Sequence, residues 1–246
     1  MRWRKEKKTL QTKTVILEKH FDYISSLRHI GVWREHKPQI SDKEKMNMKQ
    51  DYTHIIIVLD ASGSMSSIED DIKGSFNEFL KKQREEPGKT VFDLFQFNDE
   101  VVRLVKSADL AQFNDYLMAK YDCSGCTALN DAVCIGMDTV GQEFANMPEE
   151  ERPSNVLCVI ITDGMENASK QFTARDVKNR IEHQKTKYNW EFVYLAADPD
   201  AFAAGEALGI SMQDRQLVDR NSAGVAKMCC MMSVRADKIR KRPNKK

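Results

Sequence analysis

The stretch HIIIVLDASGS, residues 54–64, joins an uninterrupted apolar run to an acidic, serine-rich turn. A run of β-branched residues without polar interruption is typical of a strand covered on both faces, as in a parallel sheet. The design returns in NVLCVIITD, residues 155–163, and in FVYLAAD, residues 192–198, and in all three the apolar run ends at an aspartate. We therefore predict parallel strands at these places, with acidic side chains at their carboxyl ends.

Further strands and a set of helices complete the predicted fold. VFDLFQFN, residues 91–98, and VVRLVK, residues 101–106, are separated by a short turn, which favours an antiparallel hairpin with one strand at the sheet edge. Apolar residues at helical spacing predict helices that begin near Ile68, after Thr127, at the N-cap Thr173, near Asp200 (running to Gly209) and at Ser222. The sequence thus predicts an α/β fold, doubly wound, with a mostly parallel sheet, one antiparallel edge strand and helices on both faces.

The 246 residues divide by composition into a basic N-terminal extension and linker (1–50), a domain (51–236) and a basic C-terminal tail (237–246). The net charge of +1 hides an asymmetry, because residues 1–50 carry +7 and residues 233–246 carry +6, which leaves −12 for residues 51–232. An acidic body argues against nucleic-acid binding through the domain's own charge. We expect the basic tail to be a solvated end, and nucleic-acid contact through it is the less favoured alternative.

No apolar run approaches the ~20 residues that a membrane-spanning helix needs. The basic N-terminal stretch holds only a short apolar run, Val15 to Leu17, which is too short for a secretory signal. The single CxxC pair, Cys123 and Cys126, has no second pair and no histidines at metal-ligand spacing, which disfavours a zinc or redox site. We expect a cytoplasmic protein with no membrane partner and no disulfide framework.

Oxygen-bearing side chains stand where the predicted strands end. They are Asp60, Ser62 and Ser64 after the first strand, Thr127 at a helix start, and Asp163 at the end of a later strand. In an open parallel sheet, ligands bind outside the carboxyl ends of the strands, so these side chains are expected at one edge. Two carboxylates and three hydroxyls form an oxygen-only site for a hard divalent cation, Mg²⁺ first, with Mn²⁺ or Ca²⁺ as alternatives.

The low charge of this ligand set has a functional consequence. With only Asp60 and Asp163 ionised, a divalent cation is roughly neutralised and keeps its affinity for one more anionic oxygen. An Asp or Glu side chain of a partner protein can supply that oxygen. The sequence therefore predicts a metal site that acts in protein recognition.

The order DxSxS, then Thr, then Asp, at these loop ends, resembles the metal-ion-dependent adhesion site of the von Willebrand factor A domain family. The likeness covers about residues 53–236. It implies direct ligation by the serines Ser62 and Ser64, direct ligation by Thr127 in the partner-bound state, and contacts through water from the two aspartates.

The resemblance also bears on neighbouring positions and on partners. Asp131 matches a family position that organises a loop without ligating the metal. The family usually has two glycines before the threonine, whereas this chain has Gly125 and Cys126, a departure that concerns the conformation of this loop. Related intracellular domains work beside AAA+ ATPases, in chelatases, or in stress-response clusters of bacteria and their phages, so the resemblance implies such a setting without selecting a partner.

Some of these residues also fit other roles. Serine and aspartate before a helix are also ordinary N-caps, and Asp198 fits a turn and cap, so we leave it outside the set. A haloacid-dehalogenase-like, Mg²⁺-dependent phosphotransferase also starts with a strand that ends in an aspartate, but it resembles DxD, where this chain has Ser62. We predict a non-catalytic, divalent-metal-dependent protein-binding module. The alternative is an adaptor of the same fold that docks through its basic termini on nucleic acid or an acidic partner.

Overall fold

A mixed β-sheet forms the centre of the computed structural model, which describes residues 52–113 and 120–242. The strand order is β3-β2-β1-β4-β5-β6. All neighbouring pairs are parallel except β2 and β3, so the one antiparallel strand lies at the edge. The strands are β1 (Tyr52–Asp60), β2 (Lys89–Phe97), β3 (Val101–Asp109), β4 (Asn155–Thr162), β5 (Glu191–Ala196) and β6 (Arg215–Leu217).

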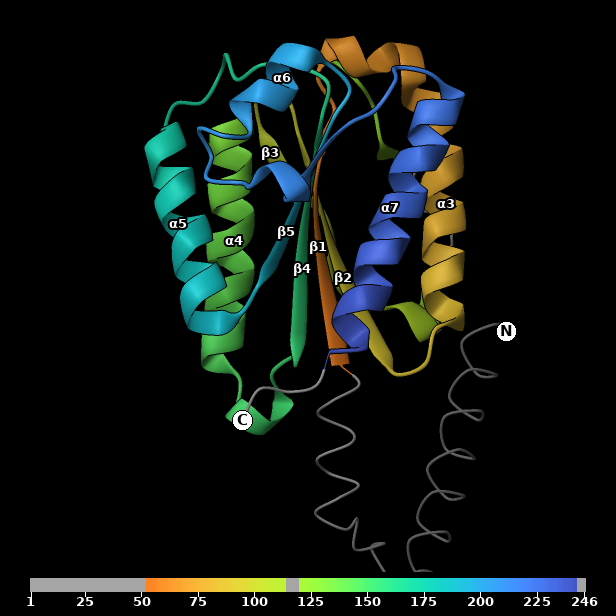
Figure 1. Cartoon of the computed structure of the whole chain (residues 1–246), viewed down its shortest axis with the longest axis vertical. Coiled ribbons are helices and arrows are strands. Elements are labelled where there is room, and N and C mark those ends of the chain that lie inside the picture. The colour runs from red at the N-terminus through yellow and green to blue at the C-terminus, as the bar shows by residue number, and fades with distance from the viewer. Residues whose placement is uncertain (1–51, 114–119, 243–246) are drawn as a thin grey trace, which may run out of the picture. The chain divides into compact units, whose positions relative to one another are not determined.

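Helices cover both faces of this sheet (Figure 1). The longer ones are α3 (Glu69–Glu85) and α7 (Ser222–Arg240) on one face, and α4 (Leu129–Asn146) and α5 (Ala174–Tyr188) on the other. The shorter ones are α6 (Pro199–Ala204) and the 3-10 turns η1 (Gly63–Ile68), η2 (Leu110–Gln112), η4 (Glu149–Glu151) and η5 (Met212–Asp214). None of the helices in the described residues is long and apolar enough to cross a bilayer.

The central strand β1 is apolar from Ile55 to Leu59 because this part contributes to two cores. Ile55, Ile57 and Leu59 belong to the core under α3 and α7. Ile56 and Val58 belong to the core under α4 and α5. Successive side chains of a strand point to opposite faces, so both sets of side chains in this part of β1 are buried and apolar. The predicted doubly wound α/β class is confirmed.

Several predicted details are confirmed and one is wrong. The hairpin of β2 and β3 forms as expected, and Thr173 caps α5 in a capping box with Asp176. The helix predicted from Asp200 to Gly209 instead ends at Ala204. Gly205 follows it, and glycine is a poor helix former. The backbone there also lies so close to Tyr194 that a Cβ would stand 2.9 Å from its ring.

Domain boundaries drawn from composition stay predictions. The extension assigned to residues 1–50 lies outside the described residues. At the other end, α7 continues past residue 236 and ends at Arg240.

A buried ionic network joins β1, β2, β3 and α4 at the amino end of the sheet. The Asp93 carboxylate is fully buried and accepts hydrogen bonds from His54 Nε2 (2.6 Å), Arg103 Nε (2.6 Å) and the Ser107 amide (3.0 Å). Arg103 also binds Glu143 through two bonds of 2.7 Å. Burial opposes ionisation of Asp93, but His54, Ser107 and Arg103 outweigh it and lower the pKa of Asp93. The role of His54 is therefore structural, within this buried network.

We expect Arg103→Leu to lower the free energy of unfolding by about 3 kcal/mol, because it removes an arginine that pairs with the buried Asp93 carboxylate and with Glu143. Urea denaturation at neutral pH measures the loss. Arg180→Leu is the matched control, because Arg180 pairs with Asp138 at the surface, and exposed pairs contribute about 1 kcal/mol or less. Equal losses in the two variants would contradict this account.

Candidate metal site

Three loops meet at the carboxyl ends of β1 and β4. They are the first loop (residues 60–64), the second loop (residues 121–128) and the third loop (residues 163–173). Two backbone hydrogen bonds tie the first loop to the second: Gly63 N–H to Gly125 O at 3.1 Å, and Ser124 N–H to Ala61 O at 2.8 Å. The positive φ of Gly125 (75°) allows the second loop to turn here.

The predicted hydroxyl ligands lie together in this junction. Ser62 Oγ is 3.1 Å from Ser64 Oγ, and Ser64 Oγ donates to Asp163 Oδ1 at 2.6 Å. A Cβ placed on Gly164 would stand 3.3 Å from Thr127 Oγ1 and 3.7 Å from Ser64 Oγ. Residues from all three loops therefore border one small space, and a side chain at position 164 would enter it.

Asp60 is held at the base of the site by its own loop and by β4. Its Oδ1 accepts the Ser62 amide at 2.7 Å, and its Oδ2 accepts the Thr162 hydroxyl at 2.6 Å. Burial raises the pKa of Asp60 to about 6, against the opposing effect of these hydrogen bonds. Thr162 was not among the residues predicted from the sequence. The available signal was its position at the end of a strand paired with β1, directly before Asp163.

Asp163 has one carboxylate oxygen that the fold leaves without a full partner. Its Oδ1 accepts from Ser64, whereas the buried Oδ2 accepts no hydrogen bond of standard geometry. Arg220 Nη2 stands 3.0 Å from this Oδ2 and donates to the Asp163 backbone carbonyl at 3.0 Å. Burial raises the pKa of Asp163, and Ser64 and Arg220 oppose that rise. Arg220 had no sequence signal, because it lies far along the chain in a loop without a motif.

Carboxylates and an amide hold the third loop against the second loop and the start of α4. The Asp131 carboxylate accepts the backbone N–H groups of residues 170–172 at 2.8–3.0 Å, as expected of a loop-organising residue. Glu166 accepts the Asn130 amide at 2.8 Å. Asn167 Oδ1 accepts the Thr127 amide at 2.8 Å, and the Asn167 amide donates to Thr127 O at 3.0 Å. Thr127 is therefore fixed on both sides of its backbone. Neither Glu166 nor Asn167 was among the residues predicted from the sequence.

The donor set fits a hard divalent cation. Hydroxyl and carboxylate oxygens are the ligands that Mg²⁺ and related ions prefer. Asp163 Oδ2, buried and short of hydrogen bonds, is available to an ion or to its water. No group of three His, Cys, Asp or Glu side chains in the described ranges could hold a metal by itself, so an ion here would depend on the serine and threonine hydroxyls. Ser64 is exposed, which leaves the site open to solvent.

Two other features are accounted for within the fold. Asp198 accepts the amides of Asp200 and Ala201 as the N-cap of α6, in line with its exclusion from the site.

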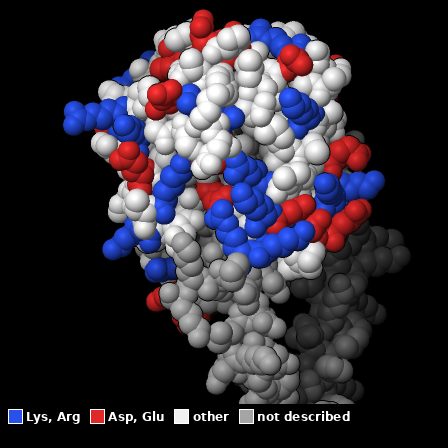
Figure 2. Space-filling model, viewed as in Figure 1, with Lys and Arg blue, Asp and Glu red and all other residues white. Residues whose placement is uncertain are grey.

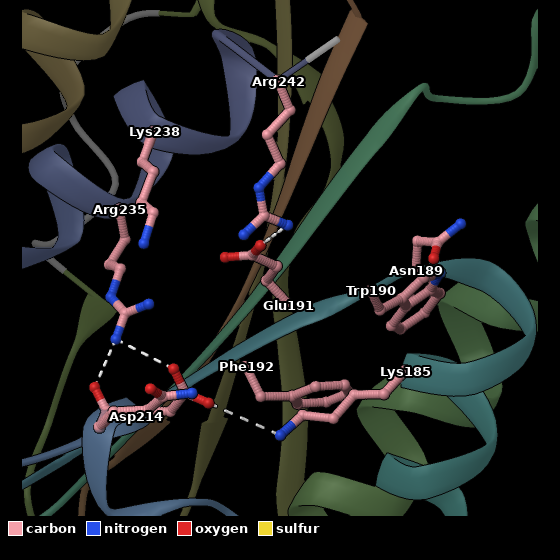
Figure 3. Close-up of a pocket in the computed structure, with 10 residues that line it drawn as sticks. Lys185, Asn189, Trp190, Glu191, Phe192, Asp214, Arg235, Lys238 and Arg242 are labelled. Carbon is pink, nitrogen blue, oxygen red and sulfur yellow. Dashed lines mark hydrogen bonds and ion pairs between the residues drawn. The ribbon is translucent and has the colours of Figure 1, made fainter. Parts of the chain in front are cut away.

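A pocket between the ends of α5 and α7, beside the start of β5, is lined with Lys and Arg (Figure 3). Figure 2, in the view of Figure 1, shows Lys and Arg side chains gathered on the face that carries α5 and α7.

The acidic groups of this pocket already pair with its basic ones. Asp214 lies 3.0 Å from Arg235 and 3.8 Å from Lys185, and Glu191 pairs with Arg242. Part of the basic charge near the C-terminus is therefore engaged within the domain, with Arg235 of α7 paired to η5 and Arg242 paired to β5. This observation does not favour the alternative in which the basic tail is the docking element.

Residues 54–204 match the von Willebrand factor type A domain family. The chain belongs to this family. No curated protein sequence matched it, but many solved structures did.

Solved structures of low sequence identity share the von Willebrand factor A fold with this chain. A D319A mutant of the PilB minor pilin from Streptococcus sanguinis has 12% identity and a TM-score of 0.55, covering 78% of this chain and 64% of that one. A von Willebrand factor type A protein from Catenulispora acidiphila has 14% identity and a TM-score of 0.51, covering 76% and 42%. Mussel byssus proximal thread matrix protein 1, with a zinc-occupied MIDAS motif, has 16% identity and a TM-score of 0.54, covering 79% and 48%. The chain thus spans less than two thirds of the length of these proteins.

In EDTA, we expect the free energy of unfolding of wild type relative to Asp60→Asn to fall by about 2 kcal/mol between pH 4 and pH 7. The folded-state pKa of Asp60 is raised from 3.8 to about 6, so its stabilising contribution is complete below about pH 4 and is lost as the pH rises through 6. Urea denaturation in EDTA at both pH values measures the difference. Asp70→Asn, on the exposed part of α3, controls for the loss of one acidic charge, and a constant difference between wild type and Asp60→Asn would rule out this effect of burial.

Proposed function

We propose that the chain is a non-catalytic protein-binding module that captures a carboxylate of a partner through a bound divalent cation. The cation is Mg²⁺ in the first place, with Mn²⁺ or Ca²⁺ as alternatives. Its ligand set is Asp60, Ser62, Ser64, Thr127 and Asp163. The observation that carries the proposal is the hydrogen bond of 2.6 Å from Ser64 Oγ to Asp163 Oδ1, which joins the first and third loops around the space that Thr127 also borders.

The residues of the chain would act through placement and charge. A bound cation would supply the electrostatic attraction for an anionic oxygen. Asp60 and Asp163 contribute two negative charges, so a divalent ion held there retains attraction for a third anion. The hydrogen bonds of Asn167 to the Thr127 backbone hold the threonine hydroxyl at the rim. The site is thereby arranged to bind an acidic side chain without a large rearrangement.

The histidines of the described part of the chain are engaged away from this site. His54 is engaged with Asp93 inside the fold, and His183 packs against Tyr188 on α5. Burial raises the pKa of the Cys123 thiol to about 12, which makes it a poor nucleophile at neutral pH. These placements support a binding role over a hydrolytic or phosphotransfer one.

Two of the similar structures support the choice of a divalent cation. One is the manganese-loaded TRAP protein of Plasmodium vivax, with 14% identity and a TM-score of 0.50, covering 72% of each chain. The other is the zinc-occupied mussel protein described above. Nothing in these similarities selects the partner, and the cytoplasmic location expected from the sequence stays a prediction.

We expect Ser62→Ala combined with Ser64→Ala to abolish the rise in melting temperature that Mg²⁺ produces in the wild type, because two direct ligands are removed. Thermal denaturation with Mg²⁺ or with EDTA measures this rise. The matched control combines Ser67→Ala with Ser75→Ala, two serines of the adjacent helical segment that lie outside the ligand set. If the Ser62 and Ser64 double variant still gains stability from Mg²⁺, the ligand assignment is wrong.

Partner binding should require both the ion and the Thr127 hydroxyl. In capture experiments from the native host, we expect the bound protein to be lost in EDTA and with Thr127→Val, and to be retained with Thr127→Ser, which keeps the hydroxyl. A contact driven by the basic termini would instead persist in EDTA, weaken with added salt and disappear when residues 237–246 are deleted. That second pattern would favour the adaptor alternative over a metal-bridged contact.

A further inference from the structure

An arginine of the chain contacts the same carboxylate that is proposed to hold the metal. Arg220 Nη2 lies 3.0 Å from Asp163 Oδ2 and donates to the Asp163 carbonyl at 3.0 Å. The Asp163 side chain is fully buried, whereas the Arg220 side chain is 38% exposed. The guanidinium therefore reaches from solvent to a proposed ligand of the site.

Hydrogen bonds on both sides of Arg220 hold the segment that carries it. The Val218 amide bonds to Ala196 O at 2.9 Å, which fastens the start of the segment to the end of β5. Asn221 caps α7, with its Oδ1 accepting the Gly224 amide at 2.9 Å. A Cβ on Gly224 would overlap the backbone of Asp219, so only glycine allows this turn. Arg220 is thus presented to the site by a fixed turn at the start of α7.

A permanent positive charge at this place has two consequences for the site. Arginine stays protonated at all physiological pH values, so it shares the charge of Asp163 with any bound cation and repels that cation. Both contacts with Asp163 use Nη2, and a guanidinium has five N–H donors. The rest of the guanidinium can therefore donate to an anion bound beside the metal.

We propose that Arg220 determines how tightly the metal site binds its cation and which acidic partners it accepts. It weakens the hold of the chain on the cation, and it provides a second anchor for an acidic peptide with two neighbouring carboxylates, one on the cation and one on the guanidinium. This inference rests on the proposed function. The proposed function alone allows any partner with an exposed Asp or Glu. The role of Arg220 limits the partner to a segment with paired acidic residues.

Isothermal titration with Mn²⁺ tests the first part. We expect Arg220→Gln to bind Mn²⁺ about three- to thirtyfold more tightly than the wild type, because a like charge several ångströms away is removed. Arg220→Lys keeps the charge and should bind like the wild type. Arg180→Gln is the control for the loss of an arginine from the surface. Unchanged or weaker binding by Arg220→Gln overturns the inference.

A peptide titration at saturating Mn²⁺ tests the second part. The probes are a short peptide with two adjacent aspartates and its counterpart with one aspartate replaced by asparagine. We expect the wild type to prefer the diacidic peptide at least severalfold and Arg220→Gln to lose that preference. A wild type that binds both peptides equally, or neither, overturns the second anchor.

These outcomes separate this inference from the proposed function. A wild type that binds no divalent cation refutes both. A wild type that binds Mn²⁺ through Ser62 and Ser64, but is indifferent to the residue at position 220, refutes only the role of Arg220. Circular dichroism of Arg220→Gln and Arg220→Lys shows whether each variant is folded.

Discussion

The parallel pairing of β1 with β4 is the constraint on which the site depends. The register aligns Leu59 with Ile161, so that Asp60 and Thr162 come next to each other at the same edge of the sheet. This adjacency places the first loop beside the third and permits the contact between Ser64 and Asp163. Because both strands are covered on two faces, their register is fixed by two cores at once. The position of the proposed oxygen ligands therefore depends on the packing of the two cores along β1 and β4.

This arrangement places two carboxylates where the protein by itself solvates them poorly. The pKa of Asp60 and that of Asp163 are both raised by burial. Thr162, Ser62, Ser64 and Arg220 compensate in part through hydrogen bonds and charge. Asp163 Oδ2 is the atom at which this compensation is incomplete. A site in which a buried carboxylate oxygen lacks hydrogen-bond donors in the absence of an ion is suited to bind an ion reversibly.

The strands and the central part of the site could be predicted from local sequence, whereas the supporting groups could not. An unbroken apolar run such as the one ending at Asp60 shows its burial directly, and the rule that carboxyl ends share an edge relates Asp60 to Asp163. The short strand β6 and the early end of α6 at Gly205 depend on contacts with β5, which no local pattern reports. Arg220 likewise acquires its role only through the turn that brings it back to the sheet, and no motif marks such a residue.

The two ends of the sheet each bury an aspartate, and their protonation has opposite effects on the fold. At the amino end, the lowered pKa of Asp93 reflects favourable pairing, so strong acid removes stability there. At the carboxyl end, the raised pKa of Asp60 reflects poor solvation, so stability is lost there as the pH rises through about 6 until a cation compensates. As far as these two groups determine stability, the ion-free domain is stable over a narrower pH range than the ion-bound domain. Ion capture would then also broaden the range of conditions in which the domain persists.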